Sequence, residues 1–359
     1  MTTSPSFDDS HLLRWSERAE ALGLLELGAV NLDHPGFVPA RARLGEFLDG
    51  EREGEMAFMS RTREVRMHPE GMLAGAQSAL VSVVPYRGES SPVARYAQAA
   101  DYHTILHRRL LQLAEIVSDE LEGVECLVCV DTKPLLERSA AVLAGLGFLG
   151  KNGCLIVPGL GSYVLIASLI TSARFVGSDR APAWVRSTEM TPWQACGSCT
   201  RCLDGCPSAA FEAVGELDPR RCISYLTIEH RGPIEEELRV AVGERLAGCD
   251  LCQEVCPYNA APDRDARIAP DVWLPAAPGR DREADLVRLV NVGNNQHRGF
   301  VKKTALNRIP RRALRRNAII ALANREGGLG EEERAALGLA ASDGDLGDLA
   351  RWAIERRGG

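Results

Sequence analysis

Hydrophobic and polar positions follow both helical and strand periods over the first 175 or so residues. Residues 11–30 predict an amphipathic helix that runs into a short strand, and the β-branched run at 78–86 predicts a buried strand. Residues 101–121 predict a helix, and residues 124–131 predict a second buried strand. Because helices and strands alternate, this part of the chain is expected to form one α/β domain.

Start and stop signals frame the next predicted helix. Pro134 suits its first turn, and Gly145 or Gly147 suits its end. Residues 154–171 then predict two buried strands joined by the glycine-rich turn PGLGS. A cysteine-rich part occupies about 190 to 260, and a link rich in Pro and Asp leads from it to a C-terminal helical segment.

Composition sets limits on compartment and class. With 45% hydrophobic and 25% charged residues, the chain is typical of a soluble globular protein of two or three domains. The first residues lack the pattern of a signal peptide, and no apolar run is long enough for a membrane span. We therefore expect a cytoplasmic protein without a membrane partner, in which 11 cysteines serve as metal ligands or small hydrophobes rather than disulfides.

Charge is distributed unevenly along the chain. The net charge is −7, yet residues 298–316 hold eight Lys or Arg and no acid. From Pro310 onward the arginines fall on one arc of a predicted helix and the apolar residues on the other. A solvated charged face is the ordinary interpretation of such a run, and a surface for a polyanion is the functional one.

The cysteine spacing carries the most specific chemistry. CGSCTRCLDGCP has the C-x2-C-x2-C-x3-C-P spacing of bacterial ferredoxins, and CDLCQEVCP repeats it with one cysteine missing, which Cys222 supplies. In two-cluster ferredoxins the last cysteine of each run ligates the other cluster. On that logic one 4Fe-4S cluster is bound by Cys196, Cys199, Cys202 and Cys256, and the second by Cys206, Cys222, Cys249 and Cys252.

Two structural zinc sites are the alternative, because C-x2-C pairs also bind zinc. Zinc does not explain the third cysteine at the next x2 step or the C-P ending of both runs, so iron-sulfur is favoured. Cys126, Cys129 and Cys154 are interpreted as buried small hydrophobes. On a strand, Cys126 and Cys129 would point to opposite faces, which argues against a shared metal.

Asp131 stands at the end of a buried strand, just before the predicted helix. Ligands gather at the carboxyl ends of strands in α/β sheets, so Asp131 is a candidate site residue. From the pattern alone, capping of the helix by Asp131 or Thr132 is the favoured interpretation.

The blocks VDTKPLLERSAAVLAGLGFLGKNG, CGSCTRCLDGCPSAA, RCISYLTIEHRG and CDLCQEVCPYN, in this order, resemble the epoxyqueuosine reductases from about residue 10 to the basic helix. The resemblance implies a cytoplasmic enzyme with cobalamin and two 4Fe-4S clusters. It would remove the epoxide oxygen from epoxyqueuosine at the wobble position of tRNA, the last step of queuosine biosynthesis. The partners are then this tRNA and an unidentified electron donor, and we expect a monomer.

The resemblance also implies an architecture of three parts. Residues 1–180 are expected to form an α/β cobalamin-binding catalytic domain, and residues 181–265 a ferredoxin-like domain with both clusters. Residues 280–359 are expected to form a small α-helical, HEAT-like domain that binds tRNA.

In this family an aspartate of the strand-end motif acts as the general acid, and the matching residue is Asp131. The motif reads DTKP here, where the family commonly has DTGP, so the charge of Lys133 could hold Asp131 ionised unless its side chain points away. The other implied cofactor contacts are Asp131 itself, Asn152, Ser224, Asp250, Asp101 and His103.

The implied tRNA contacts are His230, Arg231, Gly232, Lys302, Lys303, Arg311, Arg312, Arg315 and Arg316. For His230 and Arg231, the plainer interpretation is a helix C-terminus whose dipole they complement. For the Asp101, Tyr102 and His103 motif, it is the start of a surface helix.

Three other functions stay open at this point. A reductive dehalogenase-like cobalamin enzyme would act on a small molecule, which gives no reason for the basic run. An iron-sulfur electron carrier for a partner reductase would need no cobalamin. A zinc-bearing tRNA-binding module would be colourless, whereas a cluster protein is brown.

Overall fold

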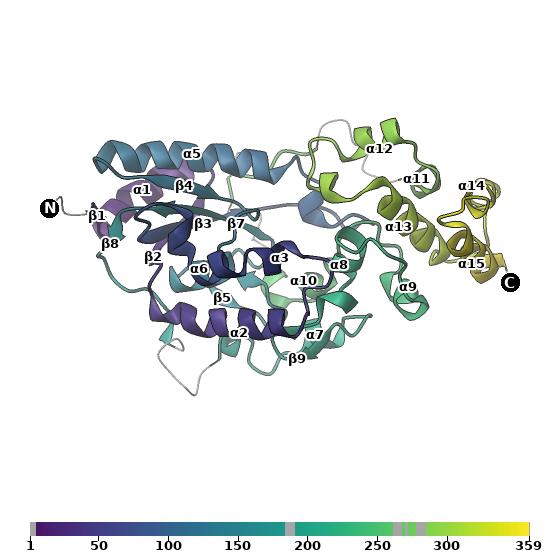
Figure 1. Ribbon diagram of the computed structural model, residues 1–359, viewed down its shortest axis with the longest axis horizontal. Helices are drawn as coiled ribbons and strands as arrows, with labels where there is room; N and C mark the ends of the chain where they lie inside the picture. Colours follow the sequence, from purple (N-terminus) through teal and green to yellow (C-terminus); the bar gives the residue numbers. More distant parts are fainter. Residues whose placement is uncertain (1–4, 184–190, 261–267, 270–271, 278–284, 359) are drawn as a thin grey trace.

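A four-stranded sheet lies at the centre of the N-terminal part of the computed structural model (Figure 1), which describes residues 5–183, 191–260, 268–269, 272–277 and 285–358. Its strand order is β2 (Leu25–Asn31), β3 (Ser78–Pro85), β7 (Val164–Thr171) and β4 (Cys126–Cys129). Each neighbouring pair is antiparallel, so β3 and β4 run in the same direction. The carboxyl ends of β3 and β4 therefore lie at the same end of the sheet, and Asp131 follows β4 there.

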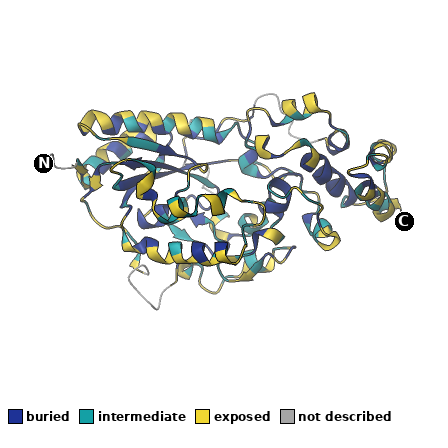
Figure 2. Ribbon diagram, viewed as in Figure 1, coloured by how far each residue is buried: buried dark blue, intermediate teal, exposed yellow. Residues whose placement is uncertain are grey.

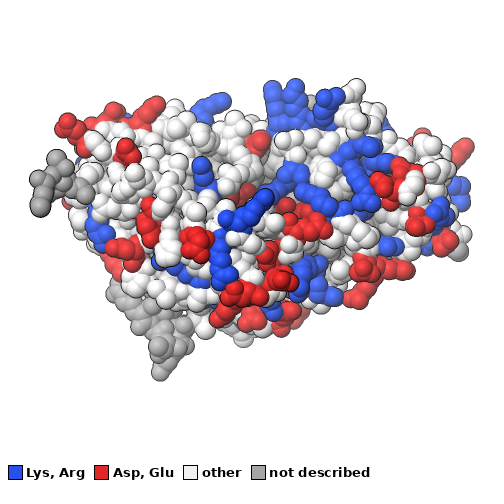
Figure 3. Space-filling view, in the orientation of Figure 1, with Lys and Arg blue, Asp and Glu red and all other residues white. Residues whose placement is uncertain are grey.

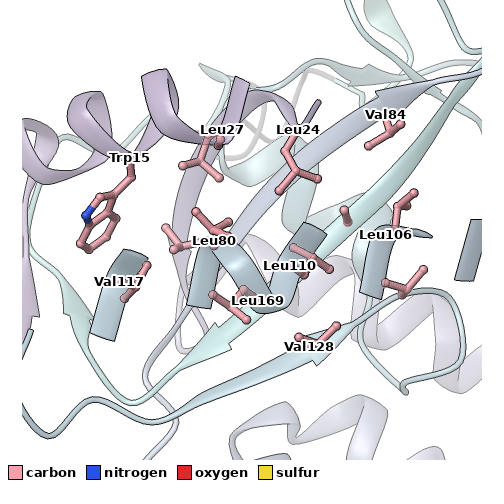
Figure 4. Close-up of a cluster of buried hydrophobic side chains, with 14 of the residues drawn as sticks. Trp15, Leu24, Leu27, Leu80, Val84, Leu106, Leu110, Val117, Val128 and Leu169 are labelled. Atoms are coloured by element: carbon pink, nitrogen blue, oxygen red, sulfur yellow. The ribbon is translucent and has the colours of Figure 1, made fainter. Parts of the chain in front are cut away.

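Helices cover both faces of this sheet, as the alternating pattern predicts. Helices α1 (Asp9–Ala21) and α5 (Tyr102–Glu120) pack on one face. Figure 4 shows the core between them, where Trp15, Leu110 and Leu169 are fully buried. The other face is covered by α6 (Glu137–Leu143).

The strand β4 shows the expected alternation of side chains. Cys126 packs into the core beside α5, whereas Cys129 belongs to the core beside α6. The two thiols thus lie on opposite faces of the sheet, as the odd spacing predicts.

The start of α6 differs from the sequence prediction. Pro134 lies before the helix rather than in its first turn, because the helix begins at Glu137. Proline disfavours helical geometry in the residue before it, and here the chain makes turns from Asp131 to Leu136 instead. These turns shape the edge of the sheet where Asp131 lies.

Shorter elements surround the sheet. A parallel pair joins β1 (Ser6–Phe7) to β8 (Arg174–Phe175), and β5 (Phe148–Leu149) pairs with β6 (Leu155–Ile156) in a hairpin. The two strands expected within 154–171 are β6 and β7, although β6 is only two residues long. Three more helices are α2 (Val38–Asp49), α3 (Phe58–Arg61) and α4 (Arg63–Met67).

The cysteine-rich part consists of short elements joined by loops. Its elements are α7 (Arg201–Asp204), β9 (Phe211–Ala213), β10 (Glu216–Leu217), α8 (Ile223–Ile228), α9 (Glu236–Val242) and α10 (Leu251–Glu254). The helices α7 and α10, which each follow the first cysteines of a run, pack against each other. Most of the predicted link at 261–283 lies outside the described residues.

Helices make up the C-terminal part. They are α11 (Leu286–Val290), α12 (Asn294–Val301), α13 (Arg311–Ala323), α14 (Glu331–Ala341) and α15 (Gly347–Gly358). Figure 2 shows that α13 is the most deeply buried of these, and every residue from Ala313 to Ala323 is buried. Ile320 packs with Ile223 and Leu226 of α8, so α13 joins the cysteine-rich part to the outer helices. Among the described residues, every helix is too short or too polar to cross a membrane.

Candidate active site and cysteine groups

Asp131 is held in an unusual backbone conformation at the end of β4. Its φ is +53°, in the left-handed region that few residues other than glycine adopt. The backbone N–H donates a hydrogen bond to Glu137 Oε1 at 3.2 Å. The carboxylate accepts a hydrogen bond from the Tyr102 hydroxyl at 3.0 Å and lies 3.3 Å from His103 Nε2. Asp131 does not cap α6, whose N-cap is Leu136, so the capping interpretation is wrong.

The first turn of α5 presents the two partners of Asp131. Asp101 is the N-cap of α5 and accepts a hydrogen bond from the backbone N–H of His103 at 3.1 Å. The same carboxylate oxygen lies 2.8 Å from His103 Nδ1, and the Tyr102 and His103 rings stack 4.0 Å apart. The imidazole is therefore fixed between two carboxylates, with Nε2 directed at Asp131. The helix start predicted here is real, and it also builds the site.

The charges at this site set where its protons reside. Hydrogen bonding to His103 lowers the pKa of Asp131, against the opposing effect of burial, and Tyr102 adds to the lowering. Burial disfavours the charged form of His103, but hydrogen bonds to Asp131 and Asp101 outweigh it and raise its pKa. The result is an Asp131 carboxylate beside an imidazole with a strengthened hold on its proton. Lys133 is exposed, and His103 rather than Lys133 is the main cause of the ionised state.

Glu137 lies under the Asp131 turn. Burial, and then the charge of Asp131, raise the pKa of Glu137 to about 8. A protonated carboxyl can still accept the Asp131 N–H bond through its carbonyl oxygen. The sequence does not single out Glu137, because a glutamate followed by Arg138 near a helix start is typical of a solvent-exposed pair of charges.

This raised pKa predicts a pH-dependent loss of stability. Between pH 4.5, the ordinary pKa of a glutamate, and pH 8, Glu137 keeps its proton in the folded chain and loses it in the unfolded chain. The free energy of unfolding therefore falls as pH rises from about 4.5 to about 8. Glu137→Gln keeps the acceptor and removes the titration. At pH 8 we expect the variant to be more stable than wild type by about 1–3 kcal/mol in urea unfolding, and the two to converge near pH 5. Glu122→Gln, at an exposed position, serves as control; parallel pH curves for Glu137→Gln and wild type would contradict the assignment.

A continuous set of contacts leads from Asp131 to the second cysteine run. The Tyr102 and Tyr96 rings meet edge to face at 6.2 Å, and Tyr96 belongs to the 3-10 helix η3 (Arg95–Ala97). The backbone N–H of Arg95 donates to Asp250 Oδ2 at 2.7 Å, and Asp250 adjoins Cys249. Arg95 Nε is buried without a hydrogen-bond acceptor among the described residues, which marks the place as suited to a polar ligand.

Electrostatic interactions link cysteines within each of the two groups of four that we propose as cluster ligands. Burial and then the charges of Cys196, Cys256 and Cys199 raise the pKa of Cys202 to about 11. In the other group, burial and then neighbours that include Cys222 raise the pKa of Cys249 to about 11. Cys222 in turn interacts with Cys206, and Cys252 interacts with Cys249 and Cys222. Within the described residues, no three His, Cys, Asp or Glu side chains converge closely enough to ligate a single metal ion.

Cys154 differs from its predicted role as a plain buried hydrophobe. Its thiol is hydrogen bonded to the thiol of Cys252, and its backbone N–H donates to Asn152 Oδ1 at 3.1 Å. The Asn152 Nδ2 donates to the carbonyl of Cys252 at 3.2 Å. The hairpin that carries both residues therefore lies against the cysteine loops.

The remaining predicted cofactor contacts lie near the same seam. Asn152 and Asp250 are buried, and both use their polar atoms in bonds within the chain. Ser224 is half-buried near the start of α8, two residues after Cys222. These residues thus border the cysteine groups more closely than they border Asp131.

The basic segment corrects a prediction. Arg315 and Arg316 are 8% and 1% exposed, so these two residues are not a tRNA surface. Arg316 donates to the backbone carbonyls of Leu226, His230 and Gly232 at 2.6 to 2.9 Å. Arg315 pairs with Asp343 at 2.8 Å and donates to the carbonyl of Val290. Both guanidinium groups hold the helices together.

The other predicted tRNA contacts divide into bonded and exposed groups. Arg311 donates to the carbonyl of Val292, and Arg312 is exposed but pairs with Asp345 at 3.2 Å. Lys302 and Lys303 are exposed and follow α12, where Figure 3 shows basic side chains gathered.

The EHRG turn behaves as its plainer interpretation states. Arg231 donates to the carbonyl of Ile228, the last residue of α8, and the helix ends before Gly232. His230 pairs with Glu55 at 2.9 Å. Both side chains therefore have structural partners.

Comparison with known proteins gives consistent matches. The family model described as "Epoxyqueuosine reductase QueG, DUF1730" matches residues 66–132, and that of a "4Fe-4S double cluster binding domain" matches residues 195–259. The epoxyqueuosine reductase of Gloeobacter violaceus is 34% identical over 85% of this chain and 93% of its own length. That of Burkholderia pseudomallei is 33% identical over 92% of this chain and 87% of its own length.

Solved structures agree with the sequence matches. A crystal structure of epoxyqueuosine reductase with an epoxyqueuosine-modified tRNA-Tyr stem loop has a TM-score of 0.78 and 27% identity, and covers 97% of this chain and 90% of that chain. A Bacillus subtilis epoxyqueuosine reductase, solved with an aspartate catalytic loop swung out of the active site, has a TM-score of 0.72 and 25% identity, covering 96% and 98%.

Proposed function

The chain belongs to the epoxyqueuosine reductase family, and on this premise we propose that it reduces epoxyqueuosine to queuosine at the wobble position of tRNA. The observation that carries the proposal is the half-exposed Asp131 carboxylate, 52% open to solvent, beside His103 and Tyr102. Loss of the epoxide oxygen as water consumes an electron pair and a pair of protons. The site must therefore supply protons and receive electrons.

Asp131 and His103 together suit the proton delivery. Because the pKa of Asp131 is lowered and that of His103 is raised, a proton shared by the pair resides on the imidazole rather than on the carboxylate. Asp131 faces the open side, and His103 lies behind it at 3.3 Å with Asp101 beyond. We infer that Asp131 passes a proton to the leaving oxygen and that His103 replaces it.

Two 4Fe-4S clusters fit the two cysteine groups, since each provides the four thiolates that such a cluster needs. The double-cluster family match over residues 195–259 supports this. The cluster ligands we propose are Cys196, Cys199, Cys202 and Cys256 for one, and Cys206, Cys222, Cys249 and Cys252 for the other. Tyr96 and Tyr102 line the contact path between the second group and Asp131.

Cobalamin is the proposed catalytic cofactor, and it supplies the strong reducing nucleophile that opens the epoxide. The residues at the seam fit it, because Arg95 Nε is buried without an acceptor among the described residues and Asp131 is open on one side. The residues proposed to border it are Asp131, Asn152, Ser224, Asp250, Asp101 and His103.

We propose that residues 1–180 form the catalytic unit, residues 181–265 the electron-relay unit, and residues 280–359 the unit that meets tRNA. The tRNA face centres on Lys302 and Lys303, which are exposed and follow α12. The carbonyl of Lys303 accepts a hydrogen bond from the backbone N–H of Asp101 at 2.9 Å. A tRNA bound at this loop would therefore lie next to the acid site, and its splayed wobble base could enter there.

Replacing Lys302 and Lys303 together with Gln should weaken tRNA binding and flatten its salt dependence. Each phosphate contact adds to the slope of log affinity against log salt, so the slope should drop by about 1 to 2. Fluorescence anisotropy with a labelled anticodon stem loop measures it. Arg174→Gln removes a charge that pairs with Asp33 and serves as control. An unchanged slope in the lysine variant would place the tRNA elsewhere.

Anaerobic reconstitution tests the function as a whole. The chain is loaded with iron, sulfide and cobalamin, then given a chemical reductant and tRNA that contains epoxyqueuosine. Mass spectrometry of the digested nucleosides should show queuosine. Cobalt analysis of the protein should show about one bound cobalamin per chain. Cluster content without cobalamin uptake would indicate an electron carrier instead, and turnover of a small halogenated substrate without tRNA turnover would indicate dehalogenase-like chemistry.

A further inference from the structure

Lys151 is a buried cation in the hairpin between β5 and β6. The side chain is 8% exposed. Its Nζ donates hydrogen bonds to the carbonyl of Gly197 at 2.7 Å and to that of Cys199 at 3.0 Å. Both acceptors belong to the first cysteine run. The hairpin thus inserts an ammonium group from the N-terminal part into a loop that holds predicted cluster ligands.

The position of Lys151 is fixed from several sides. Its own carbonyl accepts a hydrogen bond from the N–H of Gly215 at 3.2 Å, and its neighbour Asn152 is bonded to the carbonyl of Cys252. No carboxylate within the described part of the chain forms an ion pair with Lys151. Among the described residues, its charge is therefore held by backbone carbonyl dipoles, without a counter-ion.

We propose that Lys151 raises the reduction potential of the cluster bound by Cys196, Cys199, Cys202 and Cys256, and so makes this cluster the entry point for electrons. The inference rests on the proposed function, because it needs that cluster to be present. Reduction adds a negative charge to the cluster, and a fixed cation nearby favours the reduced form. Burial strengthens the effect, since water screens a buried pair of charges weakly.

The order in which electrons would pass through the two proposed clusters follows from the contacts around each group of cysteines. The second group of cysteines adjoins Asp250, which contacts Arg95 beside Tyr96 on the path to Asp131. Among the described residues the first group has no such series of contacts to Asp131, and its loop is held by Lys151. A cluster that is easier to reduce and farther from Asp131 is suited to receive electrons first from the donor.

The test is a redox titration of the reconstituted protein, followed by electron paramagnetic resonance. Lys151→Met removes the charge and keeps most of the side-chain volume. We expect the equilibrium constant for reduction of one cluster to fall about tenfold, which is a shift of about 59 mV to lower potential for one electron. The other cluster should move much less. Arg14→Met, which removes a half-exposed charge from the far helix α1, should move neither.

Iron content separates failure of this inference from failure of the proposed function. Wild-type protein that binds no clusters would contradict the function itself. Full iron in Lys151→Met with both potentials unchanged would overturn only the role of Lys151. Should Lys151→Met lose iron, Lys151→Arg and Lys151→Gln decide, because both can donate hydrogen bonds and only Arg is charged. Equal potentials in those two variants would likewise overturn the proposal, and a lower potential in the Gln variant would support it.

Discussion

Asp131→Asn should bind cobalamin and tRNA as wild type does, yet reduce epoxyqueuosine about 10²-fold or more slowly, the usual range for losing a general acid. The amide keeps the shape of the side chain and can still accept the Tyr102 hydrogen bond at 3.0 Å. It cannot take a proton from His103 and pass it on. Single-turnover assays under anaerobic conditions separate this chemical step from binding.

Structural damage is the competing explanation for any loss of activity. Asp131 has a φ of +53°, and asparagine tolerates this region about as well as aspartate, so the turn should survive. Asp119→Asn, at an exposed position near the end of α5, gives the matched control. Near-normal turnover of Asp131→Asn would mean that the proton comes from elsewhere, and the catalytic assignment would be withdrawn.

Cys222→Ala should remove one of the two clusters and leave the other. Cys222 replaces the cysteine that the second run lacks, and it lies with Cys206, Cys249 and Cys252. With three thiolates left, that cluster loses a ligand, and the iron content should fall from about eight to about four per chain. Because the contacts that lead to Asp131 begin beside Cys249 of this proposed group, turnover should be abolished.

The control for this variant is Cys126→Ala, in the core of the sheet. It should leave iron content unchanged and cost about 1 kcal/mol of stability through a small cavity. Iron analysis and absorbance of the brown protein read out both variants. Full two-cluster iron in Cys222→Ala would refute the ligand assignment.

The sequence predicts the local features of this molecule well. The helix and the short strand predicted within 11–30 correspond to α1 and β2, the helix at 101–121 to α5 and the strand at 78–86 to β3, because their patterns repeat over many residues. The grouping of the cysteines stays a prediction, which rests on the ferredoxin spacing of the two runs. The start of α6 was not, because Pro134 suits both a first helical turn and the preceding turns, and tertiary contacts of Asp131 decide between them.

The basic segment shows where pattern fails. Its arginines have no acid nearby in the sequence, but Asp343, Asp345 and Glu229 reach them from distant parts of the chain. Arg316 is satisfied by backbone carbonyls, which leave no trace in a charge pattern. Glu137 and Lys151 were missed for the same reason, since their roles depend on burial that the sequence does not display.

The buried hydrogen bonds of Arg316 and its neighbour Asn317 couple the unfolding of α13 to that of the cysteine-rich part. Asn317 donates to the carbonyls of Thr227 and Leu246, as Arg316 does to those around the end of α8. Opening α13 would leave these carbonyls without donors, at a cost that discourages partial unfolding. A shortened chain that ended before α13 would therefore not fold as the full chain does. The loops around the cysteines would lose the hydrogen-bond donors that stabilise them.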